Sequence, residues 1–279
     1  MNRKDFTIPR ERLDKNQQIF AAGLKLIGDG SVSGRTAWMA EPYLDTDSCG
    51  ISVCTDEQIE TAIAFCKKYG CQLSMHAMGT RAISRVVDRA AKEEKWNQGE
   101  EPYVRVEHIT LPSEDSIQKA AEKGIGFVTQ PIFLYAEIES YLKNLGVARM
   151  KTCYPVKKML DSGVRLCFST DAPATSWAVP SDPFPNIKGA VTRRAYDGTD
   201  CGIDQAVDVE TAISLYTREA AKMVGFERLG QLREGYKADF IVLDKDILAI
   251  PPEEIDTVQV DETYIDGACA YRRGSDAQQ

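Results

Sequence analysis

Residues 72–95, QLSMHAMGTRAISRVVDRAAKEEK, decide the fold class. QLSMH (72–76) is a short apolar run that predicts a buried strand, and residues 80–95 repeat apolar side chains at helical spacing. The same order recurs along the chain, with predicted strands at 23–30, 103–109, 125–130 and 164–170, and predicted helices at 55–70, 113–124, 134–163, 186–195 and 208–224. Strands that alternate with helices of this length indicate βαβ units. The chain is therefore predicted to be an α/β protein with a parallel sheet.

Two segments do not follow this alternation. Residues 31–54 contain Gly34, Pro42 and Gly50 and show no clear period, so we expect a long loop there. Residues 227–273 alternate apolar and polar positions around the turn signals Glu234-Gly235 and Asp266-Gly267, which predicts a small appendage of half-buried antiparallel strands. We expect residues 274–279 to be a disordered tail.

Composition excludes several classes of protein. The 279 residues are 43% hydrophobic and 27% charged, and the net charge of −8 gives no basic face for nucleic acid. No stretch has the 18 or so apolar residues that a membrane span needs, and the charged first twenty residues do not resemble a signal peptide. The eight cysteines form no CxxC pair, which favours reduced thiols and a cytoplasmic protein.

Polar residues lie where the predicted strands end, which is where functional groups collect in parallel α/β folds. The only two histidines, His76 and His108, end consecutive strands, and Asp171 ends another. Imidazole and carboxylate are common metal ligands, so this pattern indicates a metal site. The alternative is that each histidine is a hydrogen-bonded core residue and that Asp171 caps a turn. Glu107 is expected to point away from His108, to the opposite side of its strand.

Five motifs, in order, resemble the strand-end motifs of the amidohydrolase superfamily, and most closely the family 3 branch typified by N-substituted formamide deformylase. They are GLKLIGDGSVSGRTA (23–37), MHAMGTRAISRVVD (75–88), RVEHI (105–109), STDAPATSWAVPSDPFPNIKGAV (169–191) and YTREAAKMVGFERLGQLREGYKADFIVLDKD (216–246). The resemblance implies a (β/α)₈ TIM barrel with a small β-sandwich, and hydrolysis of an N-formyl or N-acyl amide by metal-activated water. It divides the chain into a barrel part at 1–226 and sandwich strands at 227–273.

The resemblance also implies roles for individual residues. Lys25 corresponds to a carbamylated lysine that bridges metals, His76 and His108 correspond to metal ligands, and Asp171 corresponds to the last-strand aspartate that ligates metal and carries a proton. Arg35, Tyr43 and Trp177 are candidates for contacts with a small amide substrate, although a solvated loop or core packing would also account for them.

One family feature is absent from this sequence. The family's first barrel strand carries a His-x-His pair, and neither histidine here belongs to such a pair. We therefore expect one divalent ion, with zinc favoured, and only part of the barrel. The chain could be a truncated enzyme that needs a missing N-terminal segment, a homo-oligomer that covers its own open side, or an inactive remnant that serves as a binding module.

Overall fold

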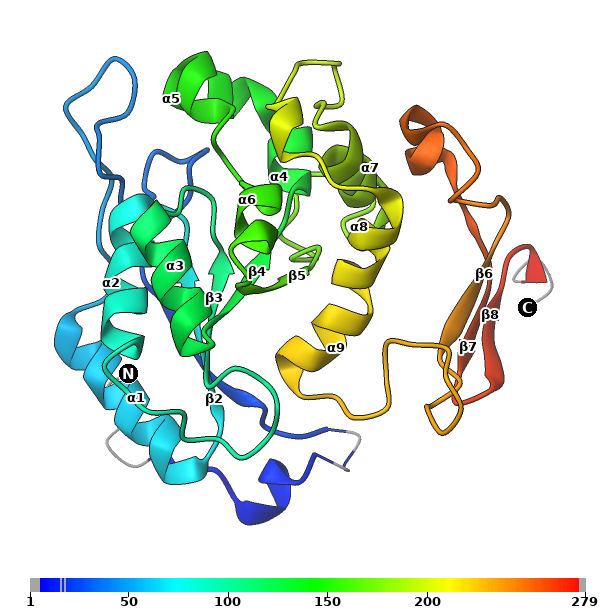
Figure 1. Cartoon of the computed structure of the whole chain (residues 1–279), viewed down its shortest axis with the longest axis horizontal. Helices are drawn as coiled ribbons and strands as arrows, with labels where there is room; N and C mark the ends of the chain where they lie inside the picture. The colour runs from blue at the N-terminus through cyan, green and yellow to red at the C-terminus, as the bar shows by residue number, and fades with distance from the viewer. Residues whose placement is uncertain (1–5, 16, 18, 276–279) are drawn as a thin grey trace.

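Five parallel strands form the sheet on which the molecule is built (Figure 1). They pair in chain order and are β1 (Gly23–Ile27), β2 (Gln72–Ala77), β3 (Val104–His108), β4 (Gly126–Thr129) and β5 (Arg165–Phe168). The computed structural model describes residues 6–15, 17 and 19–275. Within that part of the chain β1 and β5 are edge strands and the sheet does not close. The predicted parallel α/β architecture is confirmed.

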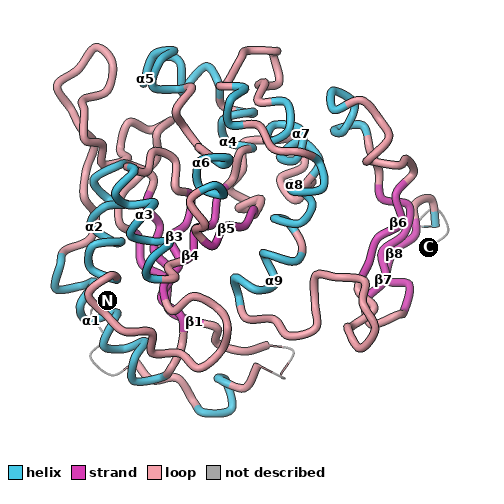
Figure 2. The backbone as a smooth tube through the Cα atoms, in the orientation of Figure 1, coloured by secondary structure: helices cyan, strands magenta, loops and turns pink. Residues whose placement is uncertain are grey.

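Helices connect the strands and cover the sheet (Figure 2). The α-helices are α1 (Asp56–Tyr69), α2 (Thr80–Ala90), α3 (Glu114–Lys123), α4 (Ile132–Ala136), α5 (Ile138–Met150), α6 (Val156–Asp161), α7 (Phe184–Thr192), α8 (Val209–Tyr216) and α9 (Arg218–Val224). The described residues also contain three 3₁₀-helices, η1 (Arg10–Leu13), η2 (Ile203–Gln205) and η3 (Pro252–Thr257). No helix in the described ranges is both long enough and apolar enough to cross a membrane.

Two of the predicted helical stretches are interrupted. The stretch 208–224 divides at Thr217, which has φ −116° and ψ −85° and whose hydroxyl donates to the Ile213 carbonyl. A threonine that bonds four residues back bends a helix, and here the chain leaves helical geometry altogether. The helical stretches predicted across 134–163 are α4, α5 and α6, and α5 is interrupted by a non-helical glycine, Gly146, with φ +73°.

The two faces of the sheet have different surroundings. Side chains such as Leu73, Met75 and Val106 face the helices and belong to the main hydrophobic core. The intervening residues point to the opposite face, where the Ser74 hydroxyl donates to Glu107 at 2.7 Å. At the β4–β5 end this opposite face is covered by Met223 of α9, which packs on Val128 and Cys167.

A second, antiparallel sheet lies to the side of the main body in Figure 1. It consists of β6 (Phe240–Leu243), β7 (Val260–Ile265) and β8 (Ala268–Arg272). The predicted β appendage is therefore present, and its last hairpin turns at Asp266-Gly267 as expected. The predicted turn at Glu234-Gly235 is also present, but the residues around it, 230–233 and 236–239, which the alternation predicted as strand, are bend and coil. The predicted tail lies outside the described residues from position 276 onward.

Candidate active site

A cavity of about 290 Å³ lies at the carboxyl ends of the parallel strands. Its walls come from β1, β2 and β3, from the loop after β1, from the start of α4 and from the segment after β5. The lining residues are Lys25, Ser31, Ser33, His76, Met78, His108, Phe133, Glu137, Asp171 and Ala174. The four residues that the sequence predicts as the metal and catalytic group thus line one cavity.

The two histidine rings contact each other in this cavity. Their centroids are 4.4 Å apart with an interplanar angle of 64°. Strand alternation alone would place His108 among the core residues Val104 and Val106. His108 instead has φ +79°, a left-handed backbone conformation that ends β3 and turns the ring toward His76.

Each ring uses one nitrogen in a hydrogen bond with the protein. His76 Nε2 lies 2.9 Å from the Gly30 carbonyl oxygen, which can only accept, so this contact favours a proton on Nε2. His108 Nδ1 lies 2.9 Å from Gln130 Oε1, and Gln130 donates its amide NH₂ to Ser169 Oγ at 2.7 Å. Nδ1 of His76 and Nε2 of His108 are therefore the nitrogens available to a ligand.

Electrostatics favour neutral imidazole at His108. Burial, reinforced by His76, lowers the pKa of His108 to about 3, so the ring is uncharged at neutral pH. Neutral imidazole is the form that binds metal ions. Burial raises the pKa of Asp171 above its ordinary value, against the opposing effect of nearby Lys25.

The side chains that line the cavity fit one metal ion when Lys25 is one of its ligands. Among the described residues, no three His, Cys, Asp or Glu side chains form a group that could hold a metal ion by themselves. His76 and His108 supply two imidazoles, and a catalytic zinc ion takes three protein ligands and keeps a fourth position for water. Lys25 lines the same cavity from the edge strand β1, where it is solvent-exposed, and is the residue predicted as a third ligand.

Three predicted substrate contacts lie outside this cavity. Arg35 Nε donates to Asn144 Oδ1 at 2.6 Å, which holds the loop after β1 against α5. Tyr43 is 2% exposed and donates its hydroxyl to the Ala37 carbonyl at 2.9 Å. Trp177 packs edge-on against Tyr135, with ring centroids 5.2 Å apart. Their role in binding substrate stays a prediction.

Glu107 lies on the site face of the sheet, contrary to the expectation that it points away. In the strand register it is paired with His76, and paired residues of parallel strands share a face. The expectation was wrong because His108, not Glu107, departs from the alternation. A neighbouring cavity of about 340 Å³ is lined by Glu107 and Arg105 as well as by Lys25 and Asp171.

Several residues that shape the site have no role in the prediction from sequence. Ser33 and Glu137 hydrogen-bond across the cavity wall, and Gln130 orients His108. Asp29 lies immediately behind His76, with Oδ1 3.5 Å from His76 Nε2. Asp29 and Gln130 had a local signal, since each is a polar residue at the end of a predicted strand, whereas Ser33 and Glu137 had none.

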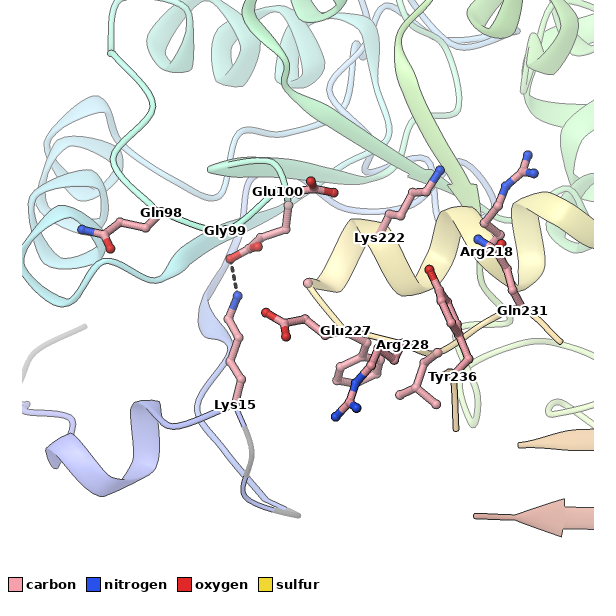
Figure 3. Close-up of a pocket in the computed structure, with 14 residues that line it drawn as sticks. Lys15, Gln98, Gly99, Glu100, Arg218, Lys222, Glu227, Arg228, Gln231 and Tyr236 are labelled. Atoms are coloured by element: carbon pink, nitrogen blue, oxygen red, sulfur yellow. Dashed lines mark hydrogen bonds and ion pairs between the residues drawn. The ribbon is translucent and has the colours of Figure 1, made fainter. Parts of the chain in front are cut away.

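A larger cavity, of about 440 Å³, lies at the opposite end of the sheet (Figure 3). Arg218 and Lys222 of α9 and Tyr236 of the following segment line it, with Lys15 on the other side. Lys15 forms an ion pair with Glu101 at 2.5 Å. None of the predicted site residues lines this cavity.

Comparisons with known proteins cover most of the chain. The amidohydrolase family matches residues 3–271. YtcJ of Bacillus subtilis, itself assigned to the amidohydrolases, is 31% identical over 255 residues, which are 90% of this chain and 47% of that protein. N-substituted formamide deformylase of Arthrobacter pascens is 30% identical over 209 residues, 74% of this chain and 38% of the enzyme.

A solved structure resembles the fold of this chain. The crystal structure of an uncharacterized metal-dependent hydrolase from Pyrococcus horikoshii superposes with a TM-score of 0.74 at 27% identity, over 85% of this chain and 47% of that one. The chain thus spans less than half the length of these relatives.

Proposed function

Because this chain belongs to the amidohydrolase family, we propose that it carries the active-site residues of a metal-dependent hydrolase that cleaves a non-peptide C–N bond in an N-formyl or N-acyl amide. The observation that carries this proposal is the contact between His76 and His108, each with one nitrogen available, in a cavity that Lys25 and Asp171 also line. The substrate class is supported by the likeness to a protein named N-substituted formamide deformylase.

His76 and His108 would hold one divalent ion, for which zinc is our proposal, and Lys25 would complete the ligand set. Lys25 can do so after its neutral amine adds CO₂ and loses a proton, which yields a carbamate anion. When bound, the ion would supply Lewis-acid activation of water and of the substrate carbonyl.

Asp171 would accept and then donate the proton in this reaction. Its carboxylate lines the cavity with both histidines, and its pKa is raised by burial, which makes it a better proton acceptor than a solvated aspartate. We assign it the role of taking a proton from the attacking water and delivering it to the leaving nitrogen. Ser33 and Glu137, which line the same cavity, would contact the substrate.

The five parallel strands would form part of a (β/α)₈ barrel. Closure of a barrel links strand number, tilt and shear, and the five described strands leave β1 and β5 unpaired on one side. We propose that further strands, from a longer chain or from a partner subunit, complete the barrel. Relatives about twice as long support this proposal. A cytoplasmic location agrees with the eight free thiols.

Metal content tests the function most directly. Purified full-length chain, loaded with Zn²⁺ and desalted, should hold about one ion per chain by mass spectrometric metal analysis, and His76→Ala or His108→Ala should abolish it. Cys269→Ser, which removes an exposed thiol, is the matched control for adventitious zinc and should change nothing. Unchanged metal in His76→Ala would mean that the histidine is structural.

The second candidate is a catalytically inactive remnant that keeps the fold as a binding module. It is favoured by the observation that no three His, Cys, Asp or Glu side chains of the described residues form a metal-binding group. A folded chain that retains no zinc and hydrolyses no N-formyl or N-acyl amide would establish this alternative.

A further inference from the structure

Asp29 is a buried carboxylate that binds three backbone N–H groups. It lies two residues after the end of β1 and is 1% exposed. Its side chain accepts from Trp38 N at 2.8 Å, Met78 N at 3.0 Å and Gly79 N at 2.8 Å. Burying a carboxylate is costly unless hydrogen bonds replace the lost water, and charge-assisted bonds to N–H groups are among the strongest in proteins. Met78 and Gly79 follow His76 by two and three residues, so Asp29 holds the backbone segment that directly follows this histidine.

The same carboxylate lies behind the ring of His76. Asp29 Oδ1 is 3.5 Å from His76 Nε2, and the neighbouring Gly30 carbonyl is 2.9 Å from the same nitrogen. Two oxygen atoms, one of them on a carboxylate, therefore face one ring nitrogen. Both favour a proton on that nitrogen, and the lone pair of the ring is then on Nδ1.

The glycines on either side of Asp29 make this approach possible. A Cβ at Gly28 would lie 2.7 Å from the His76 carbonyl oxygen, and a Cβ at Gly30 would lie 2.1 Å from Thr36 Oγ1. Real Cβ atoms do not come so close, so side chains are excluded at both positions. The Gly28-Asp29-Gly30 sequence lets the chain present a carboxylate and a carbonyl to one imidazole.

We propose that Asp29 is a positioning residue, which fixes the orientation of His76 with the proton on Nε2 and thereby presents Nδ1 to the cavity. Outer hydrogen bonds of this kind orient metal-binding histidines and strengthen them as ligands. The importance of Nδ1 as a ligand rests on the proposed function, whereas the tautomer and orientation of His76 do not.

The two histidines allow a direct test by NMR. In uniformly ¹⁵N-labelled, metal-free full chain, two-bond ¹H–¹⁵N correlations report the tautomer of each imidazole, and His76→Ala and His108→Ala assign the two ring systems. We expect the Nε2–H tautomer for His76 and the Nδ1–H tautomer for His108. A wild-type His76 with its proton on Nδ1 overturns the proposal, whatever the variants do.

Asp29→Asn tests the carboxylate itself. We expect His76 to lose its single tautomer while His108 keeps its own, and zinc affinity, measured by competition with a chelator, to fall about 10- to 100-fold. Glu101→Gln is the matched control, because Glu101 is also buried, at 6% exposure, but lies at the other end of the sheet beside Lys15. It should leave both imidazole spectra unchanged.

The outcomes separate the two proposals. An unaltered His76 spectrum in folded Asp29→Asn would mean that Asp29 only stabilises the loop, and would overturn the positioning role. The expected tautomers without zinc binding would support Asp29 and contradict the proposed metal-dependent function.

Discussion

At the scale of the residue, the site depends on backbone conformations that L-amino acids rarely adopt. His108 has φ +79°, Ile109 φ +48° and Asp171 φ +57°. Each departs from the extended geometry of the strand that precedes it, so the side chain leaves the alternating pattern. Such conformations cost on the order of 1–3 kcal/mol and occur often at functional sites. Two of the four proposed metal or catalytic residues therefore reach the cavity through a left-handed turn.

Asp171→Asn should separate metal binding from catalysis. The change keeps the size of the side chain and both imidazoles, so we expect zinc content to stay at the wild-type value. It removes the proton acceptor, so hydrolysis of a reactive N-formyl amide should fall about 10²- to 10⁴-fold. Asp161→Asn, an exposed aspartate of α6 paired with Lys157, should alter neither quantity. Full activity of Asp171→Asn would remove this residue from the mechanism.

Lys25→Ala should weaken zinc binding. If the lysine acts as a carbamate, a small carboxylic acid such as propionate can occupy the vacated space and supply the missing carboxylate. Zinc affinity of the variant should therefore rise with propionate, while that of wild type does not. Lys123→Ala, an exposed lysine at the end of α3, is the control for loss of one positive charge. No response of Lys25→Ala to propionate would argue against the carbamate.

At the level of secondary structure, the ends of the helices are set by capping side chains and by glycines next to them in the sequence. Ser113 caps α3 by accepting from Ser116 N at 3.1 Å, and Gly124 ends the helix in the left-handed conformation. Thr55 and Gln58 form the capping box of α1, which Gly70 ends in the same way. These helices place the strands that follow them, so the caps contribute to the position of the site without touching it.

Ser113→Ala should lower the free energy of unfolding by about 1 kcal/mol, the usual value of a lost N-cap. The side-chain oxygen that satisfies a backbone N–H of the first turn disappears and alanine offers no replacement. Urea unfolding followed by circular dichroism measures the change. Gln118→Ala, at an exposed position of the same helix, should stay within about 0.5 kcal/mol of wild type. Equal effects of the two changes would show that the cap contributes nothing.

At the scale of the whole molecule, the open sheet is the dominant feature. β1 and β5 each have a neighbour on one side only within the described residues, and unpaired strand edges bind other chains. The appendage sheet also exposes strand surface. β8 is exposed along its whole length, and Ile241 and Ile265 are 46% and 57% exposed. Apolar strand surface of this kind usually marks an interface.

We therefore predict that the 279-residue chain by itself does not behave as a simple monomer. Light scattering coupled to gel filtration should give a mass above 30.9 kDa or a polydisperse sample. The physical reason is that pairing of the open edges satisfies backbone groups and buries apolar surface. A monodisperse 30.9 kDa species that unfolds cooperatively would contradict this prediction.

The order of strands and helices, the family and the residues at the strand ends can all be predicted from the amino-acid sequence. Alternation over a few residues identifies strands such as 72–77, and short-range hydrogen bonds mark helix ends such as Ser113 and Gly124. Both signals arise between residues close in the chain, so they can be recognised without knowledge of the fold. The strand-end motifs carried the family resemblance, which the comparisons confirm.

Which of the strand-end residues contact one another depends on the folded chain and could not be predicted from the sequence. His108 turns toward His76 because of a left-handed backbone, Glu107 shares their face through the strand register, and Asp29 reaches groups 9 and about 50 residues further along the chain. Tyr43 has its hydroxyl on a backbone carbonyl in the core rather than in the cavity. Such contacts join residues far apart in the chain, and their geometry is set by strand pairing and packing, which local patterns do not encode.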